Sequence, residues 1–150
     1  MNCDAGAMHA KVGRYDVVMA ENERHSCLTD IRVRYAECDP MGVTHHTAYP
    51  VWFEIGRTEL LRTSGDTYAR LEQDGVLLVV VKLEVNYKRP ARYDDLLQLE
   101  TTLESCGHVK ITHTYELRRD AEVLATAKTV LACVDRDGTP REVPASIQHP

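Results

Sequence analysis

Polar and apolar residues alternate along five stretches of the chain, which is the period of β-strands with one buried face. The alternating stretches are 31–35, 76–87, 97–105, 109–117 and 123–134. Pro, Gly and Asp residues lie between them, as in turns that join antiparallel strands. The pattern therefore predicts one strand early in the chain and four long strands in its second half.

One stretch instead has the three- and four-residue spacing of an amphipathic helix. Its apolar positions are Tyr49, Trp52, Phe53, Gly56 and Leu60. Thr47 is the expected N-cap, and Pro50 falls in the first turn, where its missing N–H is not needed. We expect this helix to span about 47–62 and a short second helix to follow at 67–73. Gly56 lies on the apolar stripe, where a missing side chain often lets another backbone approach closely.

The order of strand, long helix and four strands is typical of the α+β class, with one helix packed on an antiparallel sheet. A chain of 150 residues is long enough for one domain, and no internal repeat suggests a second. Residues 1–27 have no sustained periodicity and are expected to form a partly mobile N-terminal extension. The predicted domain spans 28–136, and 137–150 is expected to be a C-terminal tail.

Composition narrows the function classes. The formal net charge of −5 argues against a general nucleic-acid binder. The longest apolar run, Val76–Val81, is far shorter than the roughly 20 residues of a membrane span. Five scattered cysteines make a disulfide module improbable, and no basic segment followed by an apolar one opens the chain. We therefore expect a cytoplasmic protein.

The segment from Arg34 to Arg62 carries the candidate chemistry. Asp39 lies where the first strand stops, and His45 and His46 lie at the start of the helix. A helix N-terminus has unsatisfied N–H groups that can stabilise a carbonyl oxygen as it becomes anionic. Together with a carboxylate, such a terminus is suited to acyl transfer.

These residue types also have ordinary structural uses. An Asp before Pro is most often a turn residue that binds its own backbone, and two neighbouring histidines are often surface residues. No third ligand stands at a recognised spacing, so no metal site is predicted. From the residues alone, both the catalytic and the structural interpretation stay open.

The same segment resembles the 4-hydroxybenzoyl-CoA thioesterase family of hotdog-fold acyl-CoA thioesterases, and within it the bacterial short-chain acyl-CoA branch. The residues that carry the resemblance are Tyr35, Asp39, Gly42, Val43, His46, Tyr49, Trp52, Phe53, Glu54 and Arg57. A second block resembles the family over the Val79–Val81 run, 87–92 and 94–97, and the likeness covers about 31–134. Many members of the branch have Tyr and Asn where this chain has His45 and Ala48.

This resemblance implies a hotdog fold, in which a five- or six-stranded antiparallel sheet wraps a long central helix. It also implies hydrolysis of an acyl-CoA thioester to a free acid and CoA, in homodimers or homotetramers with the acyl-CoA channel between subunits. No metal or redox cofactor is implied, since CoA is part of the substrate. By the same resemblance, Asp39 is the nucleophile or general base, and the backbone N–H of His46 polarises the thioester carbonyl.

The resemblance also implies substrate-binding residues. Gly42 and Tyr49 fall on the matching pattern, and the basic cluster of Lys88, Arg89 and Arg92 is the candidate for CoA phosphate contacts. The alternative for the basic cluster is a turn that simply faces water.

Three alternatives remain open at this level. Glu54 is a rival catalytic carboxylate, although an (i, i+3) pair with Arg57 is the favoured interpretation. The apolar faces with Val79, Val81, Tyr115 and Leu117 are expected in the core or a dimer interface before an acyl pocket. A non-catalytic hotdog protein that binds or senses acyl-CoA is the second candidate function, and the presence of Asp39 favours catalysis over it.

Overall fold

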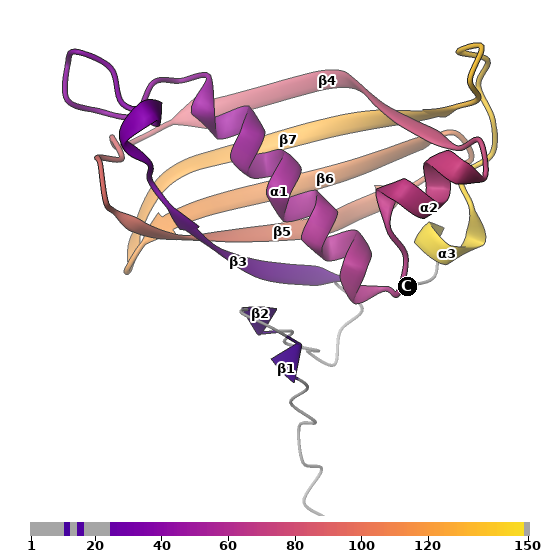
Figure 1. The fold of residues 1–150 in the computed structure, drawn as a ribbon, viewed down its shortest axis with the longest axis horizontal. Helices are drawn as coiled ribbons and strands as arrows, with labels where there is room; N and C mark the ends of the chain where they lie inside the picture. Colours follow the sequence, from indigo (N-terminus) through magenta and orange to yellow (C-terminus); the bar gives the residue numbers. More distant parts are fainter. Residues whose placement is uncertain (1–10, 13–14, 17–24, 149–150) are drawn as a thin grey trace, which may run out of the picture.

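A five-stranded antiparallel sheet curves around one long helix in the computed structural model, which describes residues 11–12, 15–16 and 25–148 (Figure 1). The sheet has the order β3-β5-β6-β7-β4. Its strands are β3 (Ser26–Arg32), β4 (Leu77–Tyr87), β5 (Leu96–Cys106), β6 (Lys110–Arg119) and β7 (Glu122–Val134). The helices are η1 (Tyr35–Glu37, a 3-10 turn), α1 (Ala48–Thr63), α2 (Tyr68–Gln73) and α3 (Ala145–Gln148). Two short strands, β1 (Lys11–Val12) and β2 (Tyr15–Asp16), pair with each other.

The predicted order of one strand, one long helix and four strands is confirmed. Thr67 caps α2 by accepting a hydrogen bond from the Arg70 N–H. Thr47 precedes α1 as predicted, but its side chain makes no capping bond to the helix. Its hydroxyl instead lies 2.7 Å from Nδ1 of His45, so it orders the loop before the helix rather than the helix itself.

The first strand begins and ends earlier than the alternation at 31–35 predicted. β3 ends at Arg32, and Tyr35 belongs to η1 with 81% of its surface exposed. The reason is a local side-chain bond, because the Glu37 carboxylate accepts the backbone N–H of Arg34 at 2.7 Å. Such a bond offers the backbone an alternative to the strand ladder.

The structure adds detail at both ends of the predicted domain 28–136. β3 begins at Ser26, and the proposed extension 1–27 otherwise lies mostly outside the described residues. In the segment expected to be a tail, Val143 and Ile147 are 1% and 6% exposed and pack in a core cluster. This cluster joins α2 and α3 to one end of the sheet, opposite the loop that precedes α1 (Figure 1).

The main core lies between α1 and the sheet. Trp52 and Phe53 of α1 are each 1% exposed, and they belong to one cluster with Leu97, Tyr115 and Leu117. The close approach expected at Gly56 is present, although side chains of β5 rather than its backbone make it. A Cβ at that position would overlap Oγ1 of Thr101 and lie 2.8 Å from Cδ2 of Leu99.

β4 is more exposed than the other long strands. A bulge between Val80 and Lys82 breaks its pairing with β7, so the predicted alternation does not continue through the strand. Val79 and Val81 are exposed, unlike Tyr115 and Leu117, which are buried in the core. β4 is also an edge strand of the sheet. Among the described residues, no helix is long and apolar enough to cross a membrane.

Candidate active site

An open groove at the N-terminal end of α1 gathers residues from the loop before the helix, the helix itself and the end of β4. Its lining consists of Asp39, Thr44, His46, Tyr49, Tyr87, Lys88, Arg89 and Pro90. Five of these are residues singled out from the sequence, and they come from two segments about 40 positions apart. The groove therefore combines a carboxylate, a helix start and two basic side chains.

A tight turn holds the carboxylate of Asp39. Its Oδ1 accepts the backbone N–H of Met41 at 2.9 Å, and its carbonyl accepts the N–H of Gly42 at 2.9 Å. Gly42 has a φ of +75°, a conformation that favours glycine. Within the described residues, Oδ2 of Asp39 has no hydrogen-bond partner. One oxygen thus fixes the side chain, and the other is free for chemistry.

The backbone N–H of His46 is also free. The N–H of Ala48 bonds to the carbonyl of His45 at 3.0 Å, but no hydrogen bond among the described residues uses the N–H of His46. This donor lies directly before α1, where the helix dipole adds positive potential. The carbonyl of His46 accepts the hydroxyl of Tyr87 at 3.3 Å, which ties the loop to β4.

Aromatic rings form the wall beside this donor. Tyr49 is 3% exposed, and its ring meets Tyr87 edge to face at a centroid distance of 4.9 Å. Burial raises the pKa of the Tyr49 phenol, partly offset by a hydrogen bond with the backbone of Ala91. The phenol is therefore protonated at neutral pH. The rings of His45 and His46 lie 4.2 Å apart.

Glu37 positions this loop, and sequence reasoning missed it. Its carboxylate is buried and accepts the indole N–H of Trp52 at 3.0 Å, while its carbonyl accepts the N–H of His45 at 2.8 Å. Burial alone would raise the pKa of Glu37, but hydrogen bonds from Arg34 and Trp52 hold it below the ordinary 4.5. The three-residue spacing of Arg34 and Glu37, which suits an (i, i+3) ion pair, was the available signal.

The three basic residues of the predicted cluster have different places. Lys88 and Arg89 line the groove, and the backbone N–H groups of both donate to the carbonyl of Leu124. Arg92 does not line it. Its guanidinium donates to the carbonyl of Gly42 at 3.2 Å and so supports the loop that carries Asp39.

The rival carboxylate lies elsewhere. Glu54 is outside the groove, with 68% of its side chain exposed, and makes the expected (i, i+3) ion pair with Arg57 at 3.1 Å. Among the described residues, no group of three or more His, Cys, Asp or Glu side chains is arranged to hold a metal ion.

Comparison with known proteins shows the family of the chain. A family model described as the thioesterase-like superfamily matches residues 33–150. The chain is 36% identical over 125 residues to the acyl-CoA thioesterase YbgC of Haemophilus influenzae, covering 79% of this chain and 92% of that one. It is 34% identical over 119 residues to the acyl-CoA thioester hydrolase YbgC of Escherichia coli O6:H1, covering 78% and 89%.

A solved structure extends the likeness to three dimensions. The DHNA-CoA thioesterase from Staphylococcus aureus superposes with a TM-score of 0.76 at 33% identity, covering 78% of this chain and 80% of that chain. The matched family region includes Asp39, His46 and the long strands of the sheet. The chain therefore belongs to the thioesterase-like superfamily and has its hotdog fold.

Proposed function

We propose that this protein is an acyl-CoA thioesterase that hydrolyses its substrate to a free acid and CoA, with Asp39 as the catalytic carboxylate. One observation carries the proposal: a free carboxylate oxygen, a free N–H at a helix start and two basic side chains share one groove. Its relatives in the superfamily are named acyl-CoA thioesterases. Within the superfamily, we favour the short-chain acyl-CoA branch of the 4-hydroxybenzoyl-CoA thioesterase family.

In the proposed mechanism, the thioester carbonyl oxygen accepts the N–H of His46 and becomes anionic as the carbon is attacked. Donors of this kind typically contribute about 2.7–4 kcal/mol to transition-state stabilisation. Oδ2 of Asp39 either attacks the carbon directly, giving a mixed anhydride that water then hydrolyses, or removes a proton from the attacking water. In the direct route the C–S bond breaks as CoA leaves as a thiolate, which takes up the proton released when water hydrolyses the anhydride. In the general-base route Asp39 takes the proton from the attacking water and passes it to the sulfur as the C–S bond breaks. Neither route requires a metal or redox cofactor.

The groove also offers contacts for the rest of the substrate. Lys88 and Arg89 are suited to the anionic phosphates of CoA, which an acidic protein must meet with a local basic patch. Gly42, a substrate-binding residue by the family resemblance, does not line the groove; it closes the turn that carries Asp39, and a Cβ there would meet no heavy atom within 4 Å. Tyr49 supplies a buried wall behind the carbonyl site. We expect the enzyme to act in the cytoplasm, where acyl-CoA is present.

We also propose that the groove is completed by a second copy of the chain. The edge strand β4 exposes a row of apolar side chains: Val79, Val80, Val81, Leu83 and Tyr87. An exposed apolar edge strand is a template for pairing with another chain. Because Tyr87 and Lys88 end this strand inside the groove, a dimer formed along β4 would place the partner beside the reacting groups. Pairing of two such dimers would give a homotetramer.

The first test measures CoA release from short, medium, long and aromatic acyl-CoAs with a thiol reagent. Asp39→Asn and Asp39→Ala should each lower kcat by about 100-fold or more, because general-base catalysis alone typically contributes that much. Glu54→Gln is the matched control, since it removes an exposed carboxylate outside the groove. Its activity should equal that of the native protein.

Two other results would contradict the proposed role of Asp39 or the proposed function. Activity that survives in both Asp39 variants but disappears in Glu54→Gln would give the catalytic role to Glu54. A native protein that binds acyl-CoA and hydrolyses none of the panel would be a non-catalytic binding protein.

A further inference from the structure

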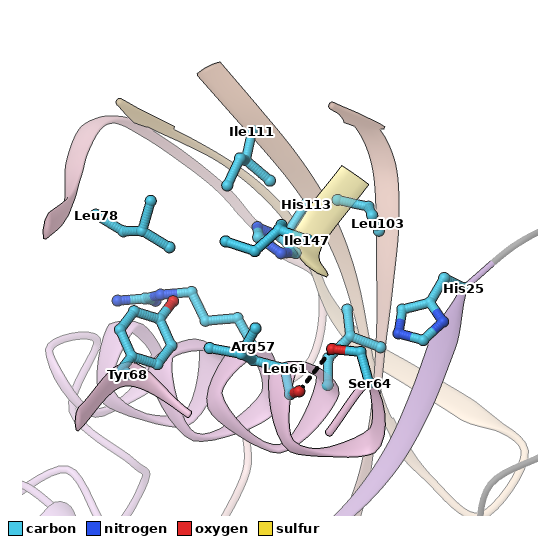
Figure 2. A pocket seen from close by; sticks show the side chains of 11 residues that line it. His25, Arg57, Leu61, Ser64, Tyr68, Leu78, Leu103, Ile111, His113 and Ile147 are labelled. Carbon is cyan, nitrogen blue, oxygen red and sulfur yellow. Dashed lines mark hydrogen bonds between the residues drawn. The ribbon is translucent and has the colours of Figure 1, made fainter. Parts of the chain in front are cut away.

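A second cavity lies between the C-terminal half of α1, the short helices α2 and α3, and the sheet (Figure 2). It is separate from the groove, since the two share no lining residue. Its walls are mostly apolar: Leu60, Leu61, Leu78, Leu103, Ile111 and Ile147. The cavity volume is about 30 Å³, room for about two water molecules or one small ion.

Two buried nitrogen atoms on the lining residues have no partner. Arg57 and His113 are 7% and 6% exposed, and neither Nε of Arg57 nor Nδ1 of His113 makes a hydrogen bond within the described structure. Figure 2 shows both side chains at the cavity, with the guanidinium of Arg57 beside the ring of Tyr68. A buried polar atom left unpaired costs about 1–3 kcal/mol, and more when it is charged. A ligand that forms hydrogen bonds with both nitrogen atoms would remove this cost.

The charge around the cavity has one sign. Among the described residues, the one ion pair of Arg57 is with Glu54, which is largely exposed, and no acidic side chain lines the cavity. The other titratable groups that line it are His25, Tyr68 and His113. Burial, with Arg57 and His25 nearby, lowers the pKa of His113 to about 4, so its ring is neutral at pH 7. Arg57 then holds the one full charge, and the neutral His113 ring can donate one N–H.

We propose that this cavity is a binding site for a small monovalent anion, of the size of a halide ion or formate, bound by Nε of Arg57 and the ring of His113. A charge-assisted hydrogen bond from a guanidinium is about twice as strong as a neutral one. The mostly apolar walls lower the local dielectric and strengthen that bond. Larger anions do not fit the volume. This site is independent of the proposed thioesterase activity, because it uses none of the residues of the groove.

Bromide tests the site directly in the native full-length protein. Crystals grown or soaked in sodium bromide should show an anomalous peak within hydrogen-bond distance of Nε of Arg57. A water molecule or empty density there at high bromide would overturn the proposal. In solution, the Tm at constant ionic strength should rise with bromide or formate relative to gluconate, which is too large for the cavity. Equal Tm values in all three salts would contradict it.

Substitutions of the lining residues test whether the difference in Tm between salts arises in the cavity. Arg57→Gln should remove the difference in Tm between bromide and gluconate. His113→Phe should reduce this difference. Arg62→Gln is the matched control, because it removes another arginine of α1 that lies outside the cavity and pairs with Glu59. If Arg57→Gln fails to fold, the bromide peak in the native crystal still decides the question. A salt difference that persists in Arg57→Gln would place the anion elsewhere.

Discussion

At the residue scale, the carboxylate of Asp39 shows how a structural and a chemical role can share one side chain. Oδ1 accepts the N–H of Met41 and closes the turn, while Asp39 lines the groove and its Oδ2 has no hydrogen-bond partner in the described structure. A turn that fixes one oxygen lowers the conformational entropy lost when the other oxygen reacts. The two interpretations of Asp39 from its sequence position are therefore compatible.

Gly56 gives a stability prediction at the same scale. Gly56→Ala adds a Cβ that overlaps Thr101 and crowds Leu99, and overpacking of a core typically costs about 1–3 kcal/mol. This cost exceeds the gain in helix propensity of about 1 kcal/mol. We expect a net loss of up to about 2 kcal/mol in the free energy of unfolding, measured with urea. Thr101→Ala in the same chain should restore part of the loss.

Gly107→Ala is the control for that substitution, because its Cβ would have an ordinary contact of 3.5 Å and no positive φ is involved. An equal effect at both glycines would show that close packing of α1 on β5 is not the cause.

Glu37 gives a prediction about pH. Its folded pKa lies below the ordinary 4.5, so its contribution to stability is present above pH 4.5 and is lost as pH falls through the folded value. Glu37→Gln cannot titrate and should therefore lose less stability between pH 5 and pH 3. At pH 7 the variant should be less stable by about 1–2 kcal/mol, since it loses charge-assisted hydrogen bonds. Urea unfolding across this pH range measures both effects, and parallel pH profiles would contradict the assignment.

At the element scale, hydrogen bonds from several elements hold the loop between η1 and α1. The carbonyl of Glu37 bonds to His45, the carbonyl of Ala91 bonds to Thr44, and Arg92 bonds to Gly42, in addition to the bond from Tyr87 of β4. The bonds of Ala91 and Arg92 come from the connection after β4, so that connection both supports the loop and presents basic side chains to the groove.

The proposed role of this connection predicts a change in substrate binding. The double variant Lys88→Gln/Arg89→Gln should raise KM for acyl-CoA by about 5- to 10-fold with little change in kcat, because each exposed charge contact contributes up to about 1 kcal/mol. With the matching N-acetylcysteamine thioester, which lacks phosphates, KM should not change. An equal rise in KM for both substrates would remove these residues from phosphate binding. Lys110→Gln, an exposed lysine outside the groove, serves as the control.

At the scale of the whole molecule, the apolar side chains exposed on β4 are not covered by any other part of the described chain. The other long strands bury one face in the core, whereas β4 has no fully buried residue. Its position at the edge of the sheet leaves one side of its backbone unpaired. A partner chain along this edge would cover apolar surface and bring its own side chains to the groove.

Val81→Lys tests this assembly. The side chain of Val81 is 53% exposed in one chain, and a lysine there would place a charge in the proposed interface. We expect the dimer dissociation constant to rise by about 100-fold, because the core of an interface excludes charged residues. Sedimentation velocity measures it, with Leu96→Lys, at a site 50% exposed on β5, as the control. A native protein that sediments as a monomer at micromolar concentration would refute the dimer.

The sequence by itself determined the long helix, the short helix after it, the five long strands and their order. The period of two in the strands, the helical stripe around Trp52 and the turn residues between them are local properties, so they could be recognised without knowledge of contacts. The tight turn at Asp39 was expected for the same reason. The basic character of 88–92 was also visible, since residue types need no structure.

Only the tertiary structure decided which of these residues meet. The sheet order places the end of β4 beside the loop before α1, so Lys88 and Arg89 share a groove with Asp39 while Glu54 points elsewhere. The buried carboxylate of Glu37 depends on a bond to Trp52, 15 positions away. Alternation shows that a strand has two faces, but whether a face is covered depends on its neighbours in the sheet, which is why β4 is exposed.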